Sequence, residues 1–317
     1  MREKLTFNEI NKSPCLTWNW LKMNRASLEV EADAEAEGGK REIKATKKGE
    51  TVRIPLAFDD GKRYEHEQVV TAEENSEITV IIDYTSDTGA GGFSSVKTRL
   101  VAKPYSKIHL VKVNMLGQGF VQIDDTDGEC ADNAEISVTQ IELGGAKTYA
   151  QVKNELKGFA SSFKSSTAYI TAGTQLLDMN YVVNHTGHKT DTKMVVKGTV
   201  SGAAQKTYRG TIDFKRGCAE ATGDEQEETL LLSPAAVNKS IPMILCDEEN
   251  VSGTHGATLG KIGAEELFYF QSRGISAETA EKILSCAKVM SVASEIPDEE
   301  LRSRIGAFIG ADEESGR

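Results

Sequence analysis

Cysteine is scarce in this chain of 317 residues, and its cysteines are scattered along it. Their number is odd and no Cys-x-x-Cys pair occurs, which argues against a disulfide framework and against a local zinc knuckle. Cys218 follows two basic residues, but we expect an inert, partly buried thiol there. Reduced thiols are typical of the cytosol. The five cysteines are Cys15, Cys130, Cys218, Cys246 and Cys286.

Long apolar runs and clusters of basic residues are also missing. No segment approaches the ~18 apolar residues of a membrane span, and the charged start at Met1 is followed by no apolar stretch of the signal-peptide kind. Lys and Arg number 37 against 48 Asp and Glu, and the resulting net charge of −11 disfavours binding to a phosphate backbone. We therefore expect a cytoplasmic protein whose partners include neither a membrane nor a nucleic acid.

Proline is rare, and none lies between Tyr105 and Ser233. Because proline cannot donate to a β-ladder, this absence is consistent with continuous sheet. The pattern predicts an all-β core and favours a β-solenoid slightly, but a sandwich and a barrel fit it as well. Short β-rich runs separated by polar turns recur at residues 108–113, 120–123, 136–143, 149–152, 168–170, 179–183, 194–200 and 207–214.

Residues 263–317 have the sequence pattern of a small helical unit. Gly263 is suited to an N-cap, and Gly274 followed by Ile275 fits a Schellman motif that would end the first helix. Ser276 is a suitable N-cap for a second helix. Pro297 suits the first position of a third helix, before an acidic first turn.

Several motifs that resemble functional sites fail on inspection. Residues 144–148 end like a phosphate-binding loop, but glycines are missing where that motif requires them. The acidic stretch Asp124–Glu129 lacks the first and last carboxylates of a calcium loop, so a solvated acidic turn is expected. His185 and His188 are expected in one turn with no third metal ligand nearby. No nucleophile, base and orienting group come together, so the motifs predict no enzyme.

One histidine stands in a glycine-rich stretch, Val251–Gly260. Gly253, Gly256 and Gly260 allow close approaches that a Cβ would prevent, so another surface could come near the ring of His255. A lone histidine in a turn is more often simply hydrogen-bonded there than a metal ligand. The local pattern alone leaves these two interpretations open.

Ordered motifs in the last third resemble the SufB/SufD family of iron-sulfur cluster assembly proteins, and SufD more than SufB. The resemblance extends in pattern from about Glu77 onward and implies a mainly β fold, a right-handed parallel β-helix (β-solenoid). The expected organisation is a short N-terminal segment, 1–50, a β-helix core, 51–262, and a C-terminal helical subdomain, 263–317. The motifs are Tyr208–Ile212, Glu228–Leu232, Ser252–Gly260, Glu266–Tyr269 and Ser272–Ile275.

The family resemblance implies a non-catalytic scaffold subunit that pairs with a SufB-like chain and docks SufC, an ABC-type ATPase. His255 matches the SufD histidine and is the candidate ligand for the iron of a nascent, transient iron-sulfur cluster. Glu227 stands where SufB carries a cysteine. Phe268, Phe270 and Arg273 are candidate contacts to the ATPase. No cofactor is expected to stay bound to the isolated chain, and flavin binding in the complex is left open, as is a homodimer in place of the SufB pairing.

Two departures from the family pattern matter. Many SufD chains carry a cysteine two residues before the histidine, where this chain has Gly253, and the N-terminal helical region of longer members is largely missing. Two alternatives to the scaffold subunit remain at this point. One is a structural β-solenoid interaction protein without a ligand role, and the other is a β-helix enzyme acting on polysaccharide.

Overall fold

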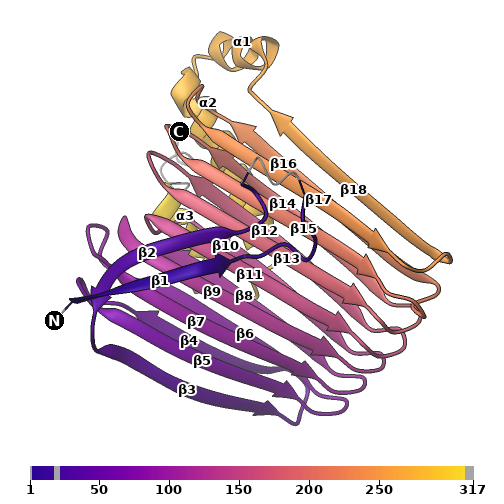
Figure 1. Cartoon of the computed structure of the whole chain (residues 1–317). Coiled ribbons are helices and arrows are strands. Elements are labelled where there is room, and N and C mark those ends of the chain that lie inside the picture. Colours follow the sequence, from indigo (N-terminus) through magenta and orange to yellow (C-terminus); the bar gives the residue numbers. More distant parts are fainter. Residues whose placement is uncertain (1, 18–21, 311–317) are drawn as a thin grey trace.

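The computed structural model describes residues 2–17 and 22–310 of the chain. Sixteen of its strands, β3 to β18, alternate between two parallel sheets of eight strands each. One sheet has the order β18-β16-β14-β12-β10-β8-β6-β4, and the other has the order β17-β15-β13-β11-β9-β7-β5-β3. Figure 1 shows these strands stacked in chain order from β3 at one end to β18 at the other. The predicted β-solenoid with a short helical region after it is confirmed.

Each turn of the solenoid contributes one strand to each sheet. Phe163 of β12, for example, pairs with Thr192 of β14, which follows it by 29 residues. The strands of the solenoid are β3 (Ala36–Ala45), β4 (Glu50–Ala57), β5 (Arg63–Ala72), β6 (Glu77–Thr85), β7 (Gly91–Ala102), β8 (Lys107–Met115), β9 (Gly119–Cys130), β10 (Glu135–Glu142), β11 (Lys147–Leu156), β12 (Ser162–Thr171), β13 (Leu176–His185), β14 (Asp191–Val200), β15 (Gln205–Phe214), β16 (Ala221–Leu231), β17 (Val237–Cys246) and β18 (Val251–Gly260).

The main core lies between the two sheets, because side chains alternate along each strand between the interior and the outer face. In β12, Phe163 is buried in this interior while Lys164 is exposed. Parallel pairing in register stacks the interior residues of successive turns, but the stacks are chemically mixed: Val96, Asp124 and Ala150 occupy the same position of β7, β9 and β11. The interior is therefore mainly apolar, with polar groups set among the apolar side chains.

The acidic stretch Asp124–Glu129 is not a solvated turn; that prediction was wrong. It forms part of β9, and Asp124 is buried in the interior, 2.5 Å from the Nζ of Lys112. Lys112 also donates to the hydroxyl of Thr126 at 2.6 Å. A carboxylate in a strand is tolerated here because a cation and a hydroxyl on the same interior face compensate it.

A two-stranded antiparallel hairpin, β1 (Arg2–Ile10) and β2 (Ala26–Asp33), lies across the outer face of the sheet that contains β3 (Figure 1). Its apolar side chains pack on Phe93, Ile123 and Tyr149 of that face. Asn11 and the guanidinium of Arg209 both donate to a carboxylate oxygen of Asp178, each at 2.7 Å. Segment 1–50 thus holds the hairpin and the first solenoid strand, β3.

Three helices follow the last strand: α1 (Ala264–Ser272), α2 (Ala277–Ala293) and α3 (Glu299–Ile309). Gly263 and Ser276 are the N-caps of the first two, as predicted, and Ser276 accepts from the backbone N–H of Thr279. The N–H of Ile275 bonds to the carbonyl of Phe270, which completes the expected Schellman motif at Gly274.

The third helix begins two residues later than predicted, at Glu299. Asp298 is its N-cap, and its carboxylate accepts from the N–H of Leu301. Pro297 therefore precedes the cap, because an aspartate that satisfies a first-turn N–H is the stronger signal for the boundary.

Helices α2 and α3 cover the outer face of the sheet that contains β18. Val289 and Val292 of α2 and Ile305 of α3 pack on an apolar patch of strands β6 to β12. Helix α1 has no buried residue and lies at the end of the solenoid where β18 is found (Figure 1). Among the described residues, no helix is long and apolar enough to cross a membrane.

Candidate functional site

His255 lies on β18, the last strand of its sheet in the part of the chain that the structure describes. It pairs in register with Glu225 of β16, whose side chain is buried in the solenoid interior. Residues that pair in a parallel ladder share a face, so His255 belongs to the interior face of its strand. It is nevertheless exposed, as is Leu259 on the same face with 54% of its surface accessible. The solenoid is open at this end.

The glycines beside His255 differ in their structural role. None of Gly253, Gly256 and Gly260 has a positive φ. A Cβ at Gly253 would lie 2.9 Å from the ring of Phe214 and 3.2 Å from Ile244, whereas one at Gly256 would meet nothing within 4 Å. Only Gly253 is required by packing. His255 has open space beside it mainly because no further turn of the solenoid packs on β18 among the described residues.

A buried polar cluster lies directly beneath the open turn. The ammonium of Lys206 is in contact with the carboxylate of Glu227 and lies over the rings of Tyr169 and Tyr208, 5.7 and 5.2 Å from their centroids. Thr229 donates to the same carboxylate at 3.1 Å. We name Lys206, Tyr208, Glu225 and Glu227 the subterminal cluster.

The electrostatics of this cluster are dominated by burial. Burial raises the pKa of Glu225 to about 8 and lowers the pKa of Lys206. One carboxylate oxygen of Glu225 and one of Glu227 have no hydrogen-bond partner among the described residues. The subterminal cluster therefore contains a carboxyl group of raised pKa and two carboxylate oxygens without hydrogen-bond partners among the described residues. It lies immediately below the strand that carries His255.

On the outer face, the same strand borders a cavity of about 510 Å³. Lys197, Asp224 and Glu228 contribute charges to its lining, and Thr254 donates to Asp224 at 2.7 Å. His255 also contacts this cavity. Among the described residues, no group of three or more histidines, cysteines or carboxylates is placed to hold a metal ion.

Helix α1 presents exposed aromatic rings. Phe268 has 71% of its surface accessible, Tyr269 is exposed, and Phe270 is half-buried. The guanidinium of Arg273 lies over the ring of Tyr269 at 4.5 Å. We call Phe268, Tyr269 and Phe270 the α1 aromatic patch. Of the predicted contacts, Phe268 and Phe270 lie on α1 and Arg273 is its C-cap. Tyr269 was not among the predicted contacts.

His185 and His188 do not form a metal pair. His185 ends strand β13 rather than lying in a turn, and its two ring nitrogens bond to the hydroxyls of Thr190 and Thr192 at 2.7 and 2.9 Å. Burial lowers its pKa to about 4. His188 stacks on Phe159 near the surface. The predicted turn, residues 184–189, begins two residues too early, because Asn184 and His185 still belong to β13.

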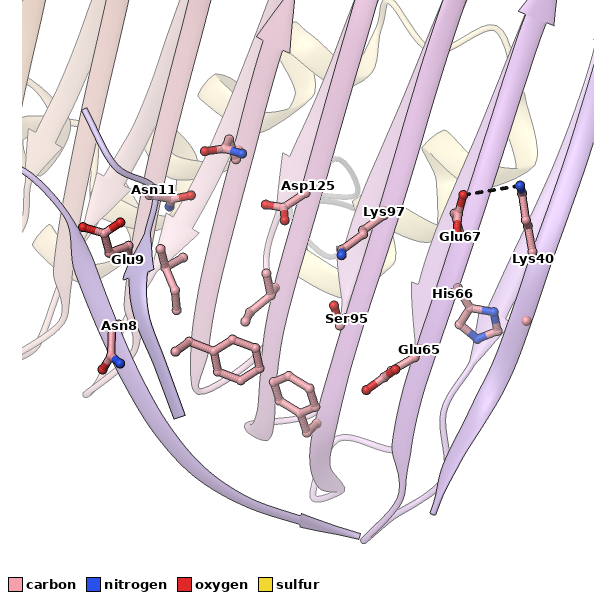
Figure 2. Close-up of a pocket in the computed structure, with 16 residues that line it drawn as sticks. Asn8, Glu9, Asn11, Lys40, Glu65, His66, Glu67, Ser95, Lys97 and Asp125 are labelled. Atoms are coloured by element: carbon pink, nitrogen blue, oxygen red, sulfur yellow. Dashed lines mark ion pairs between the residues drawn. The ribbon is translucent and has the colours of Figure 1, made fainter. Parts of the chain in front are cut away.

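A cavity of about 590 Å³ lies elsewhere, between the β1–β2 hairpin and the outer face of the sheet that contains β3 and β11. Figure 2 shows its polar lining, including the ion pair of Lys40 with Glu67, and Lys97 beside Asp125. It is on the sheet opposite to the one with His255. None of the predicted site residues lines it.

Together, these observations define a parallel β-solenoid with an exposed histidine on its last strand and an exposed aromatic helix after it. The family model described as "SUF system FeS cluster assembly, SufBD core domain" matches residues 58–288. The chain therefore belongs to the SufB/SufD family of iron-sulfur cluster assembly proteins.

Individual relatives agree with this assignment. Iron-sulfur cluster assembly protein SufD of Bacillus subtilis is 21% identical over 243 residues, which cover 76% of this chain and 56% of that protein. SufD of Escherichia coli is 23% identical over 240 residues, covering 75% and 56%. A chloroplastic SufBD family protein of Arabidopsis thaliana is 30% identical over 173 residues, covering 54% and 31%. The chain thus matches about half of the length of the two SufD proteins and about a third of the length of the Arabidopsis protein.

Proposed function

We propose that the chain is a SufD-like scaffold subunit that meets a SufB-like partner through its open terminal turn and presents His255 to a nascent iron-sulfur cluster. The observation that carries the proposal is the exposure of His255 on the interior face of an edge strand. Strands β17 and β18 both end their sheets within the described residues, so each offers unpaired backbone groups to a second solenoid. A second copy of this chain could occupy the same edge when the partner is absent.

The proposed ligand chemistry is shared between two chains. Neutral imidazole is a suitable but weaker ligand for iron than thiolate, so a histidine opposite a partner's cysteine would hold a cluster that must later be handed on. Glu227 cannot supply a thiolate, and it is already engaged with Lys206. The cluster is cargo in this scheme. We assign no stably bound cofactor and no catalytic residue to the isolated chain.

The α1 aromatic patch is the proposed docking site for a SufC-like ABC ATPase. Exposed aromatic residues of this kind are typical anchors of protein interfaces. Helix α1 follows β18 after three residues, Lys261 to Gly263, so a movement of the ATPase would be transmitted directly to the strand of His255. ATP hydrolysis belongs to the partner.

The cysteines are few and scattered along the sequence, which suits a reducing compartment, and we propose that the protein acts in the cytoplasm. No observation favours the polysaccharide enzyme, since the matched family is one of cluster assembly. The purely structural partner remains the competing interpretation.

Co-purification with candidate SufB-like and SufC-like chains tests the pairing. Leu259→Lys puts a charge on the exposed interior face of β18 and should abolish pairing, because an inward-pointing charge blocks edge-to-edge contact. Ser252→Lys, on the outer face of the same strand, is the matched control and should pair normally. If the two variants pair equally well, the open turn is not the interface.

A further inference from the structure

A cavity of about 490 Å³ on the outer face of the sheet that carries His255 has no role in the proposed function. It lies between strands β8 to β14 and helix α2. We propose that it binds a phosphate group. Its six polar groups that carry the argument are Thr139, Lys164, Ser166, Lys193, Lys197 and Ser291, which we name the lysine groove.

Two lysines of the groove stand side by side. Lys164 and Lys193 are register partners on β12 and β14, so their backbones are about 4.8 Å apart and both side chains are exposed on the outer face. Like charges directly opposite each other destabilise a sheet. Lys164 is paired with Glu135 at 2.9 Å, whereas Lys193 has no ion pair among the described residues. On its other side Lys193 faces Asp224, its register partner on β16, whose carboxylate already accepts two side-chain hydrogen bonds. An anion bound between the two lysines would separate their like charges.

A third lysine extends the positive charge along the same strand. Lys197 lies four residues beyond Lys193 on β14, on the same face, and is half-buried. It too has no ion pair within the part of the chain that the structure describes. The carboxylates in the cavity lining are Glu135, already paired with Lys164, and Glu295 of α2. The carboxylate of Glu228, the register partner of Lys197 on β16, is already engaged by a lysine of α2. The lining itself therefore holds three lysines against two carboxylates.

Hydroxyl groups form the floor between the lysines. Thr139 and Ser166 are register partners on β10 and β12, and Ser291 lies on the helix wall. The ring of His109 is 2.9 Å from the hydroxyl of Thr139, and burial lowers the pKa of this histidine, so it orients the hydroxyl as a neutral ring. The hydroxyl of Ser291 already donates to a carbonyl of α2 at 2.8 Å, which leaves Ser166 as the hydroxyl donor of the groove. This donor beside two or three ammonium groups matches the several acceptor oxygens of a phosphate.

The volume of the groove is within the range of small-molecule sites, so the phosphate can be free or part of a nucleotide. The groove adjoins the cavity beside the His255 strand, because Val195 and Lys197 line both. A bound phosphate compound would therefore lie on the same face of the sheet, between α2 and β18.

Calorimetric titration of the full chain with inorganic phosphate, ADP and adenosine tests the proposal. We expect saturable binding of phosphate and ADP but not of adenosine, with the affinity falling as salt is added. Comparable binding of ADP and adenosine would overturn the phosphate site, as would the absence of saturable binding of both phosphate compounds. Binding of ADP alone would show that the phosphate is recognised as part of a nucleotide.

Variants locate the site. Lys193→Met should weaken phosphate or ADP binding about tenfold, and Ser166→Ala severalfold. Lys153→Met removes an exposed lysine from the outer face of the other sheet and should leave the affinity within about twofold. Since Lys193 is exposed, the variant should fold, and relief from Lys164 should leave its melting temperature equal or higher. Equal affinities of the Lys193 and Lys153 variants would place the bound anion elsewhere.

Discussion

Lys206 and Glu227 form a fully buried ion pair one strand below the open turn. Lys206→Met leaves the Glu227 carboxylate buried without its cation, and we expect a loss of about 3–5 kcal/mol in the free energy of unfolding. Urea unfolding measures this loss. The double variant Lys206→Met, Glu227→Leu removes both charges and should recover most of the stability. A double variant as unstable as the single one would contradict this account of the pair.

Glu225 gives the stability a defined pH dependence. Burial raises its pKa to about 8 in the folded chain, above the ordinary value of 4.5. The folded state therefore holds a proton that the unfolded state releases, so this group's contribution is present below pH 4.5 and is lost as the pH rises to about 8. The Glu225→Gln variant should not show this loss, so its free energy of unfolding should increasingly exceed that of the wild type between pH 5 and 8. Parallel stability curves for the two proteins would show that Glu225 ionises normally.

At the residue scale, the sequence identified His255 through a family motif but not its surroundings. The exposure of His255 depends on where the sheets end, and no local pattern encodes that. Asp124 was assigned to a turn because its neighbours are hydrophilic, although its interior position is compensated by Lys112, which faces it from the opposite sheet. Lys206 and Glu227 meet in the same way, across the interior between the two sheets.

Helix α1 is the element whose surface is least explained by the fold, since none of its residues is buried. Phe268→Ser should lower the affinity for the ATPase partner more than tenfold while leaving the thermal unfolding of the chain unchanged, because the ring contributes no core packing. Phe159→Ser, an exposed phenylalanine on a solenoid turn, is the matched control. Surface plasmon resonance with the purified ATPase measures both, and equal affinities would remove α1 from the interface.

The elements themselves were largely predictable. Helix caps are local signals, so Gly263, Ser276 and Gly274 marked their boundaries correctly. Missing prolines and short β-rich runs indicated continuous sheet. They did not select the solenoid, because strands such as β12 and β14 pair across 29 residues without any repeated sequence. The family resemblance supplied what the pattern could not.

At the scale of the whole molecule, the faces and ends of the solenoid differ in which elements cover them. The hairpin covers one sheet, and α2 and α3 cover the other. The end at β17 and β18 is uncovered by any described element, and it carries both the histidine and the connection to α1. The proposed function is therefore placed at the uncovered end of the solenoid.

The most direct test is anaerobic iron and sulfide analysis of the complex with SufB-like and SufC-like chains, comparing wild type with His255→Ala. Thr254→Ala, on the opposite face of the same strand, is the control. We expect all three complexes to assemble, and the His255→Ala complex alone to carry severalfold less iron and sulfide, because one cluster ligand is missing. An intact His255→Ala complex with undiminished iron and sulfide would contradict the ligand role and leave a purely structural subunit.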